Sequence, residues 1–209
     1  MCRERLISVI HDNNNNNIIS TNVEHAADIL LQSNYGIHAL VIYSDLVTLR
    51  EFLSIYTNKG LEEKNELVCL APFYDTVEFV RKILSQGRME INLQKYENDE
   101  RSLIIIDSSE KDFDRNGIAF DKESVLNFNK HLIECANKLN KKGTSILGDV
   151  GAFLFKDLLQ GLVDYELYLL SQFDLNLKVI CLYHHGDFDR LSEDSKRKII
   201  KNHKIAIKI

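Results

Sequence analysis

The 209-residue sequence is poor in the residues that break regular structure. It has one proline and nine glycines, where average frequencies of about 5% and 7% would give roughly ten and fifteen. Such a chain is neither collagen-like nor a proline-rich linker, and it does not match a small all-β sandwich with many tight turns. The deficit favours long helices joined by short loops.

The sequence also lacks an excess of positive charge. Its 26 Lys and Arg stand against 31 Asp and Glu, a formal net charge of −5. Nucleic-acid binding needs Lys and Arg clustered on one face, and we interpret the basic residues within 196–208 as the solvated face of a last helix and strand. No apolar run approaches the ~20 residues of a membrane span. We therefore predict no direct contact with nucleic acid or with a membrane.

Paired cysteines and export signals are absent as well. Cys2, Cys69, Cys135 and Cys181 are scattered and form no C-x-x-C motif. The apolar stretch near the N-terminus is too short for a signal peptide. These features predict a cytoplasmic protein whose thiols are reduced.

Five consecutive asparagines, Asn13–Asn17, interrupt the sequence near its start. A polar tract of this kind is typical of a connector. We predict an N-terminal segment with this Asn-rich connector over residues 1–20 and a single domain over residues 21–209, a size that suits one domain.

From residue 38 onward, short apolar runs alternate with longer amphipathic ones. The short runs are continuous rather than alternating in polarity, which is typical of strands covered on both faces. Because parallel neighbours need a crossover helix, the alternation predicts a three-layer α/β domain with a mainly parallel sheet flanked by helices. The predicted strands are residues 39–43, 67–71, 103–107, 145–148, 179–183 and 205–207.

Several residues signal where the helices begin and end. Thr21 and Asp75 are each followed by a Glu three residues later, which predicts an N-cap at each position. Asp121 is the predicted cap of a third helix, and Gly143 is the predicted end of that helix, because glycine tolerates the left-handed conformation.

The glycine deficit has a location. The turn after the first predicted strand, residues 44–49, contains neither Gly nor Lys. A P-loop needs glycines there so that backbone amides cradle the phosphate, and a Lys to supply charge; a dinucleotide-binding turn needs three glycines. The absence of both argues against nucleotide catalysis.

Three carboxylates lie at positions where a functional role is conceivable. Asp107 ends a predicted strand. It is either a Walker-B-like magnesium ligand or, as we favour, a carboxylate that accepts hydrogen bonds from the Ser108-Ser109 turn. Asp149 precedes a helix and either caps it, the favoured interpretation, or faces a cleft. Glu166 falls on the apolar stripe of a helix over residues 157–173, so it needs a partner or a shifted pKa. For Glu166 a structural and a functional role weigh equally.

Two groups of metal-type ligands remain. Residues 184–187, His-His-Gly-Asp, are interpreted as a solvated loop, because metal sites draw ligands at helical or hairpin spacing and from a distant segment. His131 and Cys135 are four residues apart, but Cys135 lies beside an apolar stripe. G-x-S-x-G is absent. We predict no metal site, no cofactor and no catalytic residue.

Several short motifs follow one another in a recognisable order. They are His38 before residues 40–43, residues 103–107, Gly148-Asp149, Asp164-Tyr165-Glu166, residues 179–183, and His203 before the last predicted strand. In this order they resemble the MEDS family, a sensory domain named from methanogen and methylotroph proteins and the DcmR-type regulator. The resemblance runs from about residue 36 to the end, and it implies a RecA/KaiC-like fold that has lost its ATPase motifs.

The sequence and the resemblance together predict a non-catalytic domain that senses a small molecule or binds a protein within a signalling system such as transcription regulation. It would act through a protein partner that carries the output, and RecA-like relatives make a homo-oligomer reasonable. The alternatives are a degenerate RecA-like nucleotide-binding protein or ATPase that uses Asp107 and Glu166 around magnesium, and a structural subunit without a small ligand. Ligands of such sheets bind at the carboxyl ends of the strands. The predicted ligand contacts are His38, Tyr43, Asp107, Asp149, Glu166, Tyr183 and His203.

Overall fold

One sheet organises the molecule. The computed structural model describes residues 8–10, 18–109, 113, 121–169 and 176–209, and within them eight strands pair in the order β1-β2-β8-β3-β7-β6-β4-β5. β1 runs antiparallel to β2, and the other seven strands are parallel. The strands are β1 (Ser8–Ile10), β2 (Ile18–Ser20), β3 (Ile37–Tyr43), β4 (Leu67–Ala71), β5 (Leu103–Ile105), β6 (Thr144–Asp149), β7 (Leu177–His184) and β8 (Ile205–Lys208).

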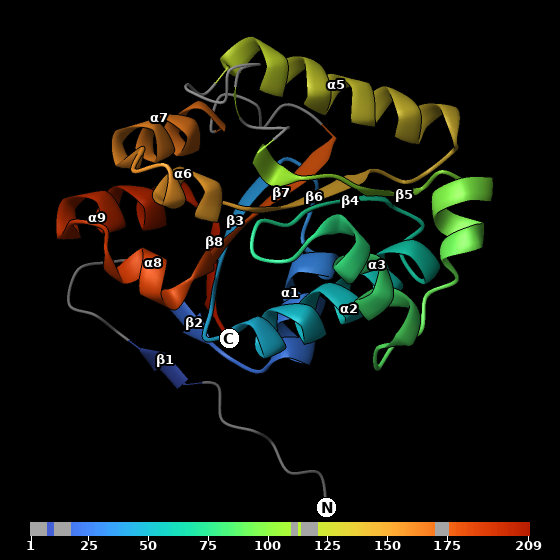
Figure 1. The fold of residues 1–209 in the computed structure, drawn as a ribbon, viewed down its shortest axis with the longest axis horizontal. Coiled ribbons are helices and arrows are strands. Elements are labelled where there is room, and N and C mark those ends of the chain that lie inside the picture. Colours follow the sequence, from blue (N-terminus) through green and yellow to red (C-terminus); the bar gives the residue numbers. More distant parts are fainter. Residues whose placement is uncertain (1–7, 11–17, 110–112, 114–120, 170–175) are drawn as a thin grey trace, which may run out of the picture.

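Helices cover both faces of the sheet (Figure 1). One layer comprises α1 (Val23–Gln32), α2 (Leu46–Glu62) and α3 (Val77–Gln86). The other comprises α5 (Lys122–Lys138), α6 (Gly151–Phe155), α7 (Leu159–Leu169) and α9 (Glu193–Asn202). Short helices α8 (His185–Asp189) and η1 (Gln94–Asp99, a π-helix) complete the described elements. The predicted three-layer α/β fold with a mainly parallel sheet is confirmed.

The central strands send alternate side chains to the two layers. In β3, Ala39 and Val41 join the core under α1–α3, whereas Leu40 and Ile42 join the core under α5–α9. Every residue of β3 and β4 is buried. This two-sided burial is the reason that these strands have continuous apolar runs in the sequence.

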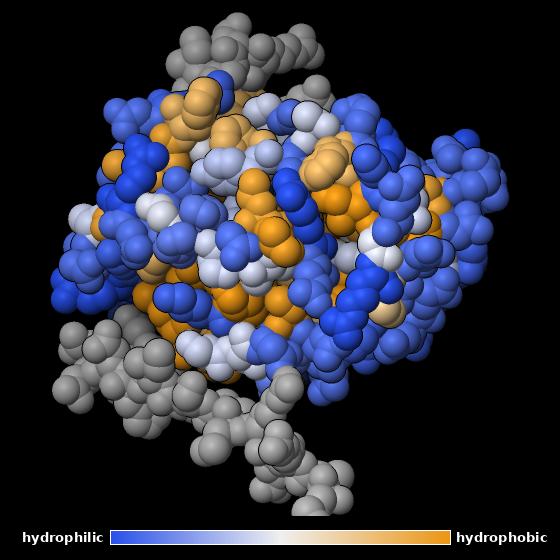
Figure 2. Space-filling model, turned by 60° about the horizontal axis from the view of Figure 1, so that its bottom comes forward, coloured by the Kyte–Doolittle hydropathy of each residue, from blue (hydrophilic) through white to orange (hydrophobic). Residues whose placement is uncertain are grey.

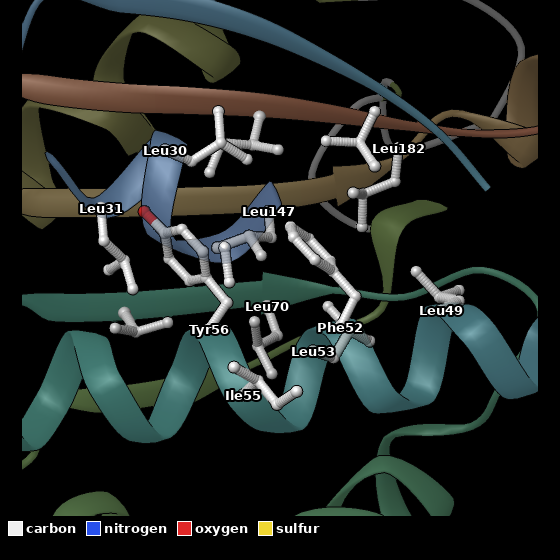
Figure 3. Close-up of a cluster of buried hydrophobic side chains, with 14 of the residues drawn as sticks. Leu30, Leu31, Leu49, Phe52, Leu53, Ile55, Tyr56, Leu70, Leu147 and Leu182 are labelled. Atoms are coloured by element: carbon white, nitrogen blue, oxygen red, sulfur yellow. The ribbon is translucent and has the colours of Figure 1, made fainter. Parts of the chain in front are cut away.

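The core under α1–α3 is built largely by α2. Phe52 and Tyr56 rise from this helix toward the sheet, close to Leu147 of β6 (Figure 3). Both aromatic residues are fully buried. Burial of a large apolar side chain stabilises the fold by roughly 1.5–3 kcal/mol, so these contacts hold α2 against the sheet.

Some predicted boundaries differ from the structure. β5 ends at Ile105 rather than at residue 107. β1 and β2, which no sequence pattern predicts, extend the sheet beside β8. The N-caps of α1 and α3 are Asn22 and Thr76, each one residue later than predicted, because their side chains accept from the backbone N–H three residues on. Asp121 caps α5 as predicted.

The predicted end of α5 at Gly143 is wrong. The helix ends at Lys138, and Asn140 adopts the left-handed conformation with φ of 53°, which Asn tolerates. Gly143 has a different reason to be glycine: a Cβ there would lie 2.3 Å from Cε1 of Tyr35. Tyr35 therefore packs directly on the backbone that leads into β6.

Hydrophilic side chains dominate the face of the molecule in Figure 2, and hydrophobic ones form separate patches on it. Within the described part of the chain, no helix combines the length and the apolar character that crossing a membrane requires.

Candidate functional site

Asp107 lies in an exposed turn after β5. Its Oδ1 accepts hydrogen bonds from the backbone N–H of Ser109, at 2.7 Å, and from the Ser109 hydroxyl. Within the described part of the chain, Asp107 makes no hydrogen bond or ion pair with the other predicted ligand residues. The favoured interpretation, a carboxylate satisfied by the following serine turn, describes this geometry.

Tyr43 and Asp149 meet at the carboxyl ends of β3 and β6. The Tyr43 hydroxyl donates to Oδ2 of Asp149 at 2.8 Å, and the Gly151 backbone N–H donates to Oδ1 at 2.8 Å. The favoured prediction that Asp149 is the N-cap of α6 is wrong, because Val150 is the N-cap. The Asp149 carboxylate instead accepts from the first backbone N–H of α6 and also faces another strand. Burial raises the pKa of Asp149 to about 7, although the hydrogen bonds from Gly151 and Tyr43 oppose the rise.

A second tyrosine–carboxylate pair lies next to the first. The hydroxyl of Tyr74 donates to Oδ2 of Asp187, and burial together with this hydrogen bond raises the pKa of Tyr74. His184 lies beside Tyr43 and Tyr74, with ring centroids 5.5 Å and 6.0 Å away. Residues 184–187 were predicted as a solvated loop; instead β7 continues to His184 and α8 begins at residue 185.

Four predicted ligand residues, His38, Glu166, Tyr183 and His203, converge in the layer under α7 and α9. All four are buried. His38 is the second residue of β3, so this group lies against the face of the sheet rather than at the strand ends. Glu166 lies on the buried face of α7, as its place on the apolar stripe predicts.

Glu166 is the centre of this group. Its Oε2 lies 3.1 Å from Nε2 of His38 and 3.3 Å from Nε2 of His203, and its Oε1 accepts from the Tyr183 hydroxyl. Nε2 of His38 is also 3.1 Å from Sγ of Cys181. We name these five residues the buried histidine cluster. Cys181 was not among the predicted site residues, because a cysteine in an apolar strand is usually core.

Burial and charge shift the pKa values in the buried histidine cluster. Burial, followed by the charge of His203, lowers the pKa of His38 to about 4. Burial opposes ionisation of Glu166, but the nearby rings of His203 and His38 outweigh it and hold its pKa well below the usual range. The pKa of Tyr183 is raised by burial and by the charge of Glu166. Glu166 is therefore a carboxylate among neutral or cationic donors.

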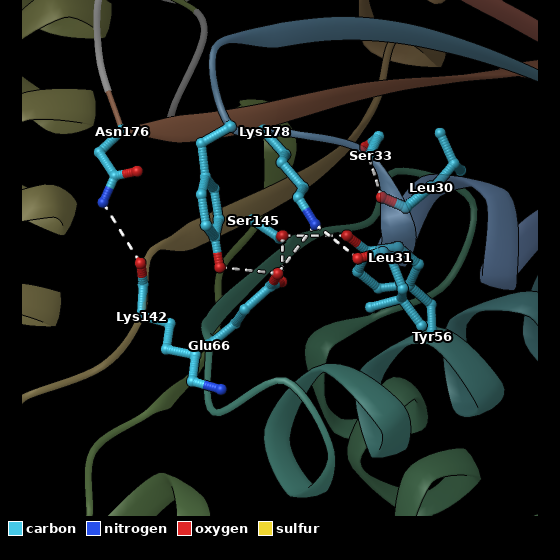
Figure 4. Close-up of polar contacts among 10 residues, drawn as sticks. Leu30, Leu31, Ser33, Tyr56, Glu66, Lys142, Ser145, Asn176 and Lys178 are labelled. Carbon is cyan, nitrogen blue, oxygen red and sulfur yellow. Dashed lines mark hydrogen bonds and ion pairs between the residues drawn. The ribbon is translucent and has the colours of Figure 1, made fainter.

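A buried ion pair at the amino ends of the strands was missed by the sequence analysis. Nζ of Lys178 lies 2.9 Å from Oε1 of Glu66 and donates to the Leu31 carbonyl (Figure 4). Ser145 donates to Oε2 of Glu66 at 2.5 Å, and Tyr35 donates to Oε1. Every oxygen of Glu66 has a partner, which indicates a structural role.

A pocket of about 470 Å³ lies between the edge strand β5 and the last turn of α5. This volume is within the usual range for small-molecule sites, about 300–1,000 Å³. Its walls are mostly apolar, with charged groups beside them. The lining residues are Glu97, Arg101, Leu103, Ile104, Ile105, Cys135, Lys138 and Leu139.

The turn after β3 has its own cap. Oδ1 of Asp45 accepts from the backbone N–H of Thr48 at 2.9 Å, and this backbone hydrogen bond is the main reason that the pKa of Asp45 is lowered. A carboxylate therefore occupies the N-terminus of α2, where a P-loop would present free N–H groups to phosphate.

One solved structure supports the fold. A KaiC-like protein of Pyrococcus horikoshii matches with a TM-score of 0.50 at 15% identity, covering 79% of this chain and 68% of that one. A second Pyrococcus horikoshii protein matches at 11% identity, over 90% and 88% of the two chains, with a TM-score of 0.47. No curated protein matches the chain.

A family model covers most of the chain. The model for the methanogen/methylotroph, DcmR sensory domain matches residues 37–204, a span that runs from the first residue of β3 to the residue before β8. It includes every residue of the buried histidine cluster and the pair Tyr43–Asp149. The chain belongs to the MEDS family of sensory domains.

Proposed function

We propose that this chain is a non-catalytic sensory domain that binds a small, largely apolar molecule in the β5–α5 pocket and signals through a protein partner. The observation that carries the proposal is the pocket itself. It offers about 470 Å³ beside apolar walls, whereas the predicted ligand residues other than Asp107 are buried and in contact with one another or with neighbouring backbone. A ligand that enters the pocket displaces solvent rather than an existing network.

The pocket also suggests a chemical preference. Ile104, Cys135 and Leu139 supply apolar or weakly polar surface, and Arg101 and Lys138 supply positive charge. Glu97, the acidic member of the lining, is paired with Arg81 at 2.6 Å. A short apolar chain with an anionic end therefore matches the pocket better than one with a cationic end.

The positions of the carboxylates argue against binding or hydrolysis of a nucleotide. Asp45 puts a carboxylate at the N-terminus of α2, and residues 44–49 contain neither Gly nor Lys. Asp107 lies in an exposed serine turn, and Glu166 is buried among histidines. These positions argue against the alternative of a degenerate ATPase that uses Asp107 and Glu166 around one magnesium ion.

Signal transmission needs a partner surface beside the pocket. β5 is an edge strand, paired with β4 alone among the described strands, and unpaired backbone groups of an edge can pair with another chain. A ligand can signal only by favouring one of two arrangements. A pocket formed by the edge strand and α5 gives the ligand contact with both elements.

Ligand titration tests the proposal. Thermal unfolding and titration calorimetry with hexanol, hexanoate and hexylamine are expected to show binding of the first two, with hexanoate the tighter. Ile104→Trp, which fills the pocket, is expected to abolish this binding. Val47→Trp is the matched control, because Val47 is 72% exposed on α2, in the other layer, and it is expected to leave the binding unchanged.

Two results contradict the proposal. Binding of hexanoate that persists undiminished in folded Ile104→Trp would remove the pocket as the ligand site. Stabilisation by ATP or GTP with magnesium that is lost in Asp107→Ala would favour the nucleotide-binding alternative. We expect no thermal shift with either nucleotide.

A further inference from the structure

The buried histidine cluster has the composition of a metal site. One ring nitrogen of His38 and of His203, a carboxylate oxygen of Glu166 and Sγ of Cys181 all lie within 4.8 Å of one another, and all four residues are buried. Among the described residues, no other group of three or more potential metal ligands converges in this way. Two imidazoles, one thiolate and one carboxylate are ligands that Zn²⁺ accepts.

The distances suit a tetrahedral shell. Bond lengths of about 2.0–2.3 Å to nitrogen, oxygen and sulfur place neighbouring donor atoms of a tetrahedron about 3.4 Å apart. Three of the six separations between donor atoms are 3.1 Å from His38 to Glu166, 3.3 Å from His203 to Glu166 and 3.1 Å from His38 to Cys181. The other three are no longer than 4.8 Å, so side-chain shifts of about an ångström bring all four atoms to this spacing around one ion.

The hydrogen bonds around the cluster orient the donors inward. Nδ1 of His203 lies 2.6 Å from the carbonyl oxygen of Ile199, so this nitrogen carries the proton. In a neutral ring, Nε2 is then a bare lone pair that faces Oε2 of Glu166, another lone-pair atom. Neither atom makes a well-formed hydrogen bond, although both atoms are fully buried. Two facing lone pairs repel each other, and a proton or a metal ion between them removes the repulsion.

The surroundings resemble those of protein metal sites. A metal-bound histidine usually donates its other N–H to a backbone carbonyl or carboxylate, as His203 does to Ile199. The Tyr183 hydroxyl occupies Oε1 of Glu166 and leaves Oε2 for the centre. One thiolate and one carboxylate also balance the charge of a divalent ion, which removes the cost of leaving net charge in the core.

We propose that His38, Glu166, Cys181 and His203 bind one zinc ion. Four protein ligands in a fully buried position make the site structural rather than catalytic. Binding replaces the proton of the Cys181 thiol with the metal, and that proton is released to solvent. The ion joins β3, β7, α7 and the segment before β8. This proposal does not rest on the β5–α5 pocket.

Elemental analysis of the full chain is the direct test. Protein purified without chelator and dialysed is expected to retain about one zinc per chain, and Cys181→Ser is expected to lose most of it. Cobalt added after zinc removal is expected to give a thiolate charge-transfer absorption, which Cys181→Ser abolishes. Cys135→Ser is the matched control for metal content, because Cys135 also lies beside a histidine, with Sγ 3.5 Å from Nε2 of His131, but is half-buried on α5 and outside the buried histidine cluster.

Tyr183→Phe separates the metal site from a purely structural hydrogen-bond network. Loss of a residue that orients a ligand typically weakens metal affinity by about 10–100-fold, and a competition titration with a chromophoric chelator measures it. Folded wild-type protein with no stoichiometric zinc and no cobalt band that depends on Cys181 would overturn the proposal. A cobalt band that depends on Cys135 instead would overturn it equally.

Discussion

Replacing Asp149 with Asn tests the electrostatics of the strand ends. Asp149 is fully buried, and its pKa is raised to about 7 from an ordinary value of 3.8. Between these values the folded protein binds a proton that the unfolded chain has released, so the stability contributed by Asp149 falls as the pH rises through this range. Three pKa units at 1.36 kcal/mol each correspond to about 4 kcal/mol.

The Asn side chain keeps both contacts of Asp149. Its amide oxygen accepts from the Gly151 N–H, and its NH₂ group donates to the Tyr43 hydroxyl oxygen, the two partners of the carboxylate. We therefore expect Asp149→Asn to match the wild type near pH 4 and to exceed its free energy of unfolding by up to about 4 kcal/mol at pH 8.

Urea denaturation at several pH values between 4 and 8 measures the difference. Tyr43→Phe is a second variant: loss of its hydrogen bond to the carboxylate removes an effect that lowers the pKa of Asp149, so the fall in stability is expected at higher pH. A stability difference between Asp149→Asn and wild type that does not change with pH would refute the reasoning.

Three further predictions concern stability and are measured by urea denaturation. Lys178→Met leaves Glu66 buried without its cation and is expected to cost about 3–5 kcal/mol, part of which Glu66→Gln should restore; an additive double variant would contradict this. Gly143→Ala is expected to cost about 1–3 kcal/mol, because its Cβ would lie 2.3 Å from the Tyr35 ring, and Tyr35→Ala should relieve the cost. Asp45→Ala removes the cap of α2 and should lower the urea midpoint; an unchanged midpoint would mean that water replaces the cap.

Most of the sheet follows from local sequence patterns. The continuous apolar runs at residues 67–71 and 179–183 predict strands because both faces of β4 and β7 are buried. The three-residue strand β2 has no such pattern, and its pairing with β8 depends on where the last strand of the chain lies. Short edge strands are therefore poorly encoded by periodicity.

Local signals fix helix ends only to within a residue or a turn. Thr21 and Asn22 are both good caps, and so are Asp75 and Thr76, so the sequence offers two starting positions one residue apart. The contact between the cap side chain and the backbone decides in favour of the second of each pair.

In the candidate site too, local sequence patterns predict part of the arrangement and the tertiary structure supplies the rest. The position of Glu166 on an apolar stripe predicts a buried carboxylate, and it is buried. Its partners have no fixed spacing: His38 and Cys181 are 143 positions apart. The pair Glu66–Lys178, 112 positions apart, was missed for the same reason.

The sequence by itself determined the α/β class, the missing phosphate loop and the need of Glu166 for partners, because these depend on residue type and short-range spacing. Only the tertiary structure decided which side chains meet. β3 lies between β7 and β8, which brings His38 beside Cys181 and beside His203 at the entrance to β8. Strand order is set by crossover connections and by the packing of two helical layers, and no local pattern encodes it.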